Sequence, residues 1–118
     1  MPLTPPVFIR GDDLLIFASI ADAESWLEPV DVSPDDSAFD AEGRALHVRV
    51  RGEVKRSWTG IDQRGARVEV VVAEENPMHV DELRTELLRW LTAVEGSPPP
   101  SGELHDLVQL ARKYVLRR

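Results

Sequence analysis

The chain has 118 residues, no cysteine and a formal net charge of −7 at neutral pH. Its length suits a single domain, residues 1–118, that buries roughly two-thirds of the surface its unfolded chain exposes. The absence of cysteine excludes a disulfide framework, a thiolate nucleophile and a thiolate metal site. No apolar run approaches the roughly 20 residues of a membrane span, so we expect a cytoplasmic protein that does not bind membranes.

The acidic side chains are concentrated in the first third of the chain. Residues 1–42 hold ten acids and one base, a net −9, whereas residues 43–118 hold thirteen bases and eleven acids, a net +2. An acidic surface repels the phosphates of nucleic acids and of anionic lipids, and it attracts a basic protein. The alternative interpretation is that this charge only keeps the protein soluble.

The first predicted elements are an extended arm, two strands and a short helix. Residues 1–6 are proline-rich and lack the basic start and apolar centre of a secretion signal. Val7–Arg10 and residues 14–18 are apolar runs separated by a turn, and both are predicted strands. Ser19 predicts the N-cap of a helix that ends before Pro29, because the residue before proline disfavours helical backbone.

A loop rich in carboxylates follows this helix. Residues 28–36 lack the regular ligand spacing and the glycine of a calcium-binding loop, so we interpret them as a solvated loop without metal. Trp26 precedes the loop and would anchor a protein partner if its ring is exposed. The predicted partner-binding residues are Trp26 and nearby acids: Glu28, Asp31, Asp35, Asp36 and Asp40.

An antiparallel β-meander is predicted to follow. Its strands are residues 37–40, Ala45–Arg51, 53–59 and 67–73. The second and fourth strands alternate between apolar and other side chains, the period-2 pattern of a half-buried strand. Gly43 allows the positive φ of a first turn, and residues 60–65 form the last one. The side chains predicted to face the core are Leu46, Val48, Val50, Val68, Val70 and Val72.

Two helices complete the predicted fold. Asn76 as N-cap and Pro77 at the first helical position predict a helix over residues 78–95. Residues 96–100 form a proline-rich connector, and a last helix begins at Ser101 or Gly102. The longer helix has an apolar stripe of Val80, Leu83, Leu87, Trp90, Leu91 and Val94.

Together these elements predict an α+β fold. We expect a mainly antiparallel sheet of four to six strands, with the two C-terminal helices packed on one face and a short N-terminal helix. The stripe of the longer helix is expected to pack on the inward-facing valines of the meander. Trp58 and Trp90 are interpreted as packing residues rather than as a binding box.

The sequence contains no recognisable catalytic or cofactor motif. His47, His79 and His105 are dispersed, and none has a second metal ligand at a suitable spacing. A Gly-x-Ser-x-Gly elbow and a glycine-rich phosphate loop are both missing. A serine–histidine–aspartate triad needs no neighbouring positions and stays open. We therefore expect no cofactor, no metal and no enzyme activity.

One basic patch accompanies an aromatic side chain. Arg49, Arg51, Lys55 and Arg56 lie near Trp58, and such a surface can stack and hold a single nucleic-acid strand. The alternative is the solvated face of an ordinary sheet, since Arg49 and Arg51 alternate with apolar residues. One aromatic residue in an acidic chain does not match the usual nucleic-acid footprint, so we expect no nucleic-acid partner.

Two segments, residues 26–32 and 39–46, carry a resemblance to a known group. They resemble small uncharacterised actinobacterial proteins with a Leu-Glu-Pro-x-Asp-Val … Tyr-Asp-x-x-Gly-Arg-x-Leu pattern, in which Phe39 here replaces the tyrosine. The overall layout is similar in style to immunity proteins of bacterial toxin systems, which are small, acidic, cysteine-free α+β proteins without catalytic motifs. Neither resemblance implies a role for an individual residue.

Two functions are consistent with the sequence. The first is a non-enzymatic protein-binding module, of the immunity kind or a homodimer, whose acidic first third binds a basic partner. A homodimer would use Val71 and Ala73 on the outer sheet face, or an open strand edge. The second is a small enzyme or ligand-binding domain with a pocket between sheet and helices.

Overall fold

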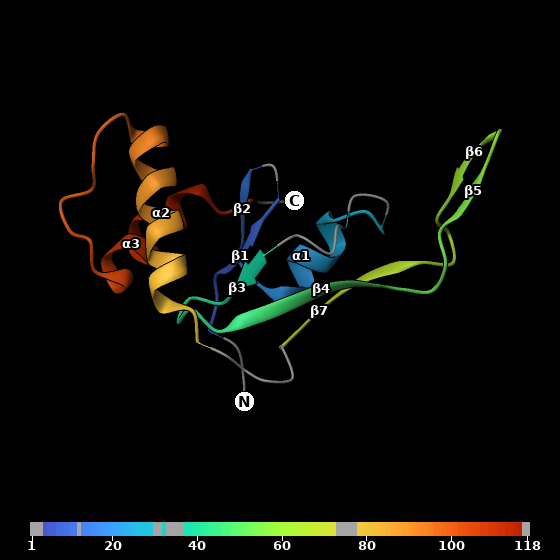
Figure 1. The fold of residues 1–118 in the computed structure, drawn as a ribbon, viewed down its shortest axis with the longest axis horizontal. Helices are drawn as coiled ribbons and strands as arrows, with labels where there is room; N and C mark the ends of the chain where they lie inside the picture. The colour runs from blue at the N-terminus through green and yellow to red at the C-terminus, as the bar shows by residue number, and fades with distance from the viewer. Residues whose placement is uncertain (1–3, 12, 30–31, 33–36, 73–77, 117–118) are drawn as a thin grey trace.

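The computed structural model describes residues 4–11, 13–29, 32, 37–72 and 78–116. Within these residues it has an α+β fold, with a five-stranded antiparallel sheet, a separate two-stranded sheet and three α-helices (Figure 1), which confirms the predicted fold class. The elements in chain order are β1 (Val7–Arg10), β2 (Leu14–Phe17), α1 (Ile20–Trp26), β3 (Ser37–Phe39), β4 (Ala45–Arg51), β5 (Lys55–Ser57), β6 (Gly60–Asp62), β7 (Arg67–Val72), α2 (Val80–Glu95), α3 (Leu104–Ala111) and the 3₁₀ turn η2 (Arg112–Tyr114).

The larger sheet has the strand order β2-β1-β3-β4-β7, and all its neighbouring strands are antiparallel. Both outer strands make a further backbone contact. On β2 the carbonyl of Ile16 accepts a 2.7 Å hydrogen bond from the amide of Leu116. On β7 the amide of Val70 donates to Oε2 of Glu24, on α1, at 2.8 Å. Each contact uses a backbone group that an edge strand would otherwise offer to another chain.

The sheet separates two hydrophobic clusters. Because side chains alternate along a strand, Phe8 faces one side of β1 while Val7 and Ile9 face the other. The first cluster joins α2 and α3 to β1, β2 and β3; its buried residues are Phe8, Leu14, Ile16, Phe39, Leu83, Leu87, Leu91, Leu107, Val108 and Ala111. The second cluster joins α1 to the opposite face; its buried residues are Val7, Ile9, Phe17, Ala23, Ala38, Leu46 and Val70.

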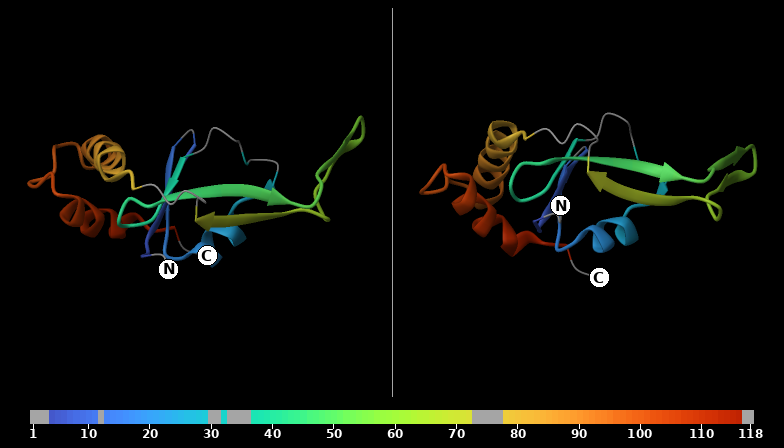
Figure 2. Two further views of the ribbon diagram at one scale, coloured as in Figure 1. Left: turned by 60° about the horizontal axis from the view of Figure 1, so that its bottom comes forward. Right: turned by 90° about the horizontal axis from the view of Figure 1, so that it is seen from below.

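The two C-terminal helices therefore share a face, but the predicted contact of α2 is wrong. From the stripe of α2, Leu83, Leu87 and Leu91 pack on β1, β2 and β3, whereas the predicted packing of Val80 and Val94 is wrong because both are exposed. Leu46 and Val70 belong to the cluster on the α1 side. The cause is the strand register. Leu46 pairs with Ala38, and the next residue of β3, Phe39, faces α2, so alternation places the apolar residues of β4 and β7 on the far side. Figure 2 shows α1 beneath β7, near the middle of the molecule, with α2 and α3 at one end.

The helix boundaries agree in part with the predictions. Ser19 caps α1 as predicted, because its hydroxyl accepts from the amide of Asp22 at 3.1 Å. The helix α2 begins at Val80 rather than at residue 78, and Met78 forms an isolated β-bridge with Arg44. The predicted cap at Asn76 and Pro77 lies outside the described residues. The last helix begins at Leu104, slightly later than predicted.

β4 and β7 lead into a hairpin that protrudes from the rest of the molecule, at the right of Figure 1. We call residues 49–69 the protruding hairpin. It makes the molecule elongated, with extents of 50 × 32 × 24 Å. The strand predicted over residues 53–59 and the turn predicted over residues 60–65 are both corrected here. β5 and β6 pair through a two-residue turn at Trp58 and Thr59, so Gly60–Asp62 is a strand.

No helix within the described part of the chain has the length and apolar character that crossing a membrane requires.

Candidate functional site

The tip of the protruding hairpin carries the most exposed large apolar side chain of the described residues. Trp58 is 97% exposed, and Ile61, on the neighbouring strand, is 54% exposed. All three residues of β5 are exposed, and neither hydrophobic cluster of the described residues includes a residue of the tip. The sequence predicted Trp58 to be a packing residue, and its exposure shows that this prediction was wrong.

A close backbone approach and two ion pairs form the base of the hairpin. Gly52 has a φ of +88°, and a Cβ atom at this position would lie 2.0 Å from the carbonyl oxygen of Gly65. Only glycine fits at this position without moving the backbone of the turn at Gly65. Below it, Glu69 accepts hydrogen bonds of 2.7 Å from Arg49 and from Arg51. The bond from Arg49 is the main reason that the pKa of Glu69 lies below its ordinary value.

The protruding hairpin is basic, although the chain as a whole is acidic. It holds six basic and three acidic side chains, a net charge of +3. Since the whole chain has a net charge of −7, the residues outside the hairpin have a net charge of −10. One pair near the tip is satisfied internally: Arg64 donates to both carboxylate oxygens of Asp62, at 3.0 and 2.9 Å, and thereby lowers the pKa of Asp62. Lys55 and Arg56 form no ion pair within 4.0 Å among the described residues and are exposed.

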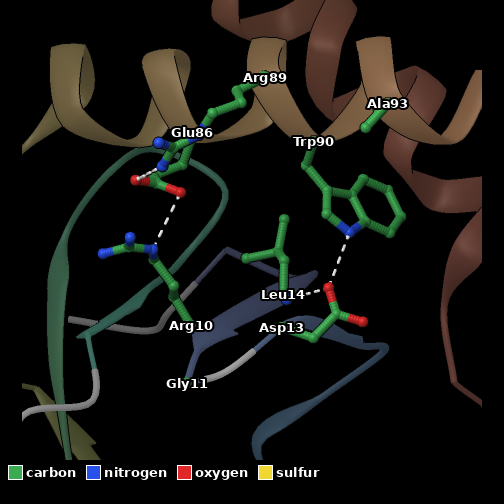
Figure 3. A pocket seen from close by; sticks show the side chains of 8 residues that line it. All are labelled: Arg10, Gly11, Asp13, Leu14, Glu86, Arg89, Trp90 and Ala93. Carbon is green, nitrogen blue, oxygen red and sulfur yellow. Dashed lines mark hydrogen bonds and ion pairs between the residues drawn. The ribbon is translucent and has the colours of Figure 1, made fainter. Parts of the chain in front are cut away.

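A hollow of about 280 Å³ lies between β1, β2 and α2 (Figure 3). Its polar side chains converge on one another. Glu86 forms ion pairs with Arg10 and Arg89, and the indole of Trp90 donates to Oδ1 of Asp13 at 3.3 Å. These contacts tie α2 to the β1–β2 turn, so they serve the packing of the helix and give the ligand-binding alternative little support.

The predicted acidic surface is only partly described. Trp26 is 40% exposed, with its ring tilted against Phe17 at 5.8 Å between centroids, and Glu28 is exposed. Asp31, Asp35 and Asp36 lie outside the described residues. The structure brings Trp26 and Glu28 to the same end of α1 and exposes both.

Asp40 does not belong to an exposed acidic surface, because its side chain is wholly buried. Its carboxylate holds the turn before β4 together and accepts four hydrogen bonds, from the amides of Thr4 (3.3 Å), Glu42 (3.0 Å) and Arg44 (2.9 Å) and from the Arg44 guanidinium (3.4 Å). The sequence placed this aspartate beside a glycine turn but gave no sign of its burial. We correct its predicted role from partner binding to turn formation.

Among the described residues, no group of three or more histidine, aspartate or glutamate side chains is placed to hold a metal ion. Of the three histidines, only His79 forms an ion-pair contact there, between its Nδ1 atom and Oε2 of Glu82 at 3.1 Å. Sequence reasoning found the basic patch of the hairpin but missed its tip. The available signal was Gly60, which directly follows Trp58 and Thr59 at the fourth position of a turn, where glycine is favoured in type I turns.

Comparison of the chain with protein-family models, with curated proteins and with solved structures found no match.

Proposed function

We propose that this protein is a non-enzymatic protein-binding module whose main contact is the tip of the protruding hairpin. The observation that carries the proposal is Trp58, which is 97% exposed at the end of a hairpin that extends away from the hydrophobic clusters. Exposed apolar groups at such a position are typical of interaction sites. Tryptophan and arginine are also the residues most enriched at the energetic centres of protein interfaces.

Burial of Trp58 in an interface would contribute a substantial part of a binding free energy. Burying a large aromatic side chain removes about 150–250 Å² from water, a gross gain of about 4–6 kcal/mol at about 25 cal/mol per Å². An isolated two-stranded hairpin is at best marginally stable. A partner that covers Trp58 and Ile61 would bury apolar surface and order the hairpin in one step.

A protein partner fits the tip better than a nucleic acid does. Stacking on a single strand normally uses several aromatic side chains along a basic groove. The tip offers one aromatic ring, and the hairpin carries Glu53, Asp62 and Glu69 among its bases. An aromatic anchor with a charged rim is instead the usual anatomy of a protein contact.

The acidic surface of the first third belongs to the same proposal as a second contact region. Trp26 and Glu28 are exposed, and three further acids follow in the sequence. An immunity-like role, in which this surface binds a basic partner, is supported by its charge and by the absence of a catalytic motif in the sequence. Reversing the charge of Glu28, Asp31 and Asp35 together would weaken such binding, whereas unchanged binding would remove the acidic surface from the proposal.

The test is photo-crosslinking in the source cells. A benzophenone amino acid replaces Trp58, and a matched variant carries it at the exposed Thr85 on α2. We expect one discrete protein adduct from position 58 and none from position 85, identified by mass spectrometry. Lys55→Glu together with Arg56→Glu should reduce this adduct. The absence of a protein adduct, or an adduct to nucleic acid alone, would contradict the proposal.

A further inference from the structure

We propose that the tip of the protruding hairpin docks on an apolar patch of a second copy of this chain. This inference rests on the proposed function, because it takes the tip to be a protein contact and names the partner. The patch consists of Met78 and Val80, with Glu42, Asp81 and Glu82 around them. We call these five residues the α2 patch.

The α2 patch is contiguous in the structure. The amide of His79 donates to the carbonyl of Gly43 at 2.7 Å, and Met78 bridges to Arg44. A Cβ atom at Gly43 would lie 2.9 Å from the Cα atom of Val80, so the turn containing Glu42 lies directly against the start of α2. Met78 is 52% exposed and Val80 39% exposed, and both are among the exposed large apolar side chains of the body.

The charges of the patch complement those of the tip. Glu42, Asp81 and Glu82 are all exposed acids; Glu42 and Asp81 each lie 3.7 Å from an arginine, and Oε2 of Glu82 lies 3.1 Å from Nδ1 of His79. The tip supplies Lys55 and Arg56, which are exposed and form no ion pair within that distance among the described residues. The flexible thioether of a methionine packs well against an aromatic ring. If Trp58 packs on Met78, then Lys55 and Arg56 of the tip can lie opposite the acids of the patch. This arrangement provides both an apolar contact and complementary charges.

The charge distribution also selects between two ways of pairing copies. Two protruding hairpins side by side would bring a net +3 against a net +3, whereas a hairpin against a body brings +3 against −10. Like charges facing each other across an interface are unfavourable, and opposite charges steer the encounter. Within one chain the hairpin points away from α2, so its tip cannot contact the α2 patch of the same molecule (Figure 1). A second copy of the chain offers the α2 patch that the tip of the first copy can contact.

The first measurement is sedimentation of the whole protein over a wide concentration range, at low and at high salt. We expect reversible self-association that weakens at high salt, because screening reduces the attraction between tip and patch. Trp58→Ala removes the tip and Met78→Arg makes the patch basic. Each should raise the dissociation constant at least roughly 30-fold, the loss expected for an interface hot spot.

Two controls make the assignment specific. Val94→Arg changes an exposed apolar residue at the other end of α2, and it should leave association unchanged. An equimolar mixture of the Trp58→Ala and Met78→Arg variants contains one intact patch and one intact tip, so the mixture should associate although neither variant does alone. Circular dichroism confirms that all variants are folded.

A wild-type protein that stays monomeric, or association that survives Met78→Arg, would overturn the inference. If the wild-type protein is monomeric but Trp58 crosslinks to a different protein in cells, the inference falls and the proposed function stands. If neither self-association nor a protein adduct is found, both fall.

Discussion

Asp40 shows how one buried carboxylate organises several segments of this chain. It is wholly buried, it bonds to the turn that precedes β4, and it bonds to Thr4 in the N-terminal segment. The same turn supports the start of α2, through the 2.7 Å hydrogen bond from His79 to Gly43. A single side chain thereby links the N-terminal segment, the central strands and the longest helix.

Asp40→Ala should destabilise the protein strongly. Removing this carboxylate leaves the backbone amides of Glu42 and Arg44 without their acceptor and removes the buried anion of the pair with the Arg44 guanidinium, which is only 6% exposed. Breaking a buried pair in this way costs about 3–5 kcal/mol, which urea denaturation followed by fluorescence would measure. Glu42→Gln is the matched control, because Glu42 is 55% exposed at 3.7 Å from the same arginine, and it should cost less than about 1 kcal/mol. Equal effects of the two changes would contradict the role assigned to Asp40.

At the scale of elements, α2 is held by one line of leucines that penetrates the first hydrophobic cluster. Leu87 is wholly buried, whereas the adjacent Leu88 is 37% exposed. Leu87→Asp should therefore cost at least about 4 kcal/mol, because it leaves a cavity and buries an unpaired charge. That loss is comparable with the whole stability of a small domain. Thermal unfolding of Leu87→Asp and of Leu88→Asp would separate the two positions, and a folded Leu87→Asp protein would show that α2 is not essential to the core.

The periodicities of the sequence predicted the long elements correctly. Alternation identified β4 and β7, and the 3-4 spacing of leucines identified α2. Alternation fixes which side chains of a strand share a face, but it does not say which face meets which helix. That choice depends on the pairing of β3 with β4, where Ala38 lies opposite Leu46, and a strand of only three residues gives no periodic signal.

The exposure of Trp58 and the burial of Asp40 were the hardest features to predict from the sequence. Trp58 resembled a core residue because tryptophan usually is one, and only the two-residue turn around it determines its exposure. Asp40 resembled its acidic neighbours because a sequence does not distinguish a solvated carboxylate from one surrounded by amides. Both errors have the same origin, because burial depends on contacts with segments distant in the chain. Asp40 is bonded to the distant Thr4, whereas Trp58 belongs to neither hydrophobic cluster of the described residues.

At the scale of the whole molecule, the protruding hairpin determines the shape. The radius of gyration is 15.2 Å, against about 13.5 Å for a compact chain of this length. Replacing residues 52–66 by Asn-Gly would join the paired residues Arg51 and Arg67 through a two-residue turn. Small-angle scattering should then give a radius of gyration of about 13 Å, the value for a compact chain of the shortened length. The melting temperature should change little, because neither hydrophobic cluster includes the removed residues. Failure of this shortened protein to fold would show that the hairpin supports the body.

Two contacts at the sheet edges, from Leu116 to Ile16 and from Val70 to Glu24, bear on how the protein resists aggregation at high concentration. A strand with an unpaired edge can pair with a strand of another molecule, and repeated pairing of this kind leads to insoluble fibrils. Here one backbone group of each edge strand, β2 and β7, is already hydrogen-bonded to another residue of the same chain. The binding proposed for the hairpin tip would therefore not require an open sheet edge, which would itself promote aggregation.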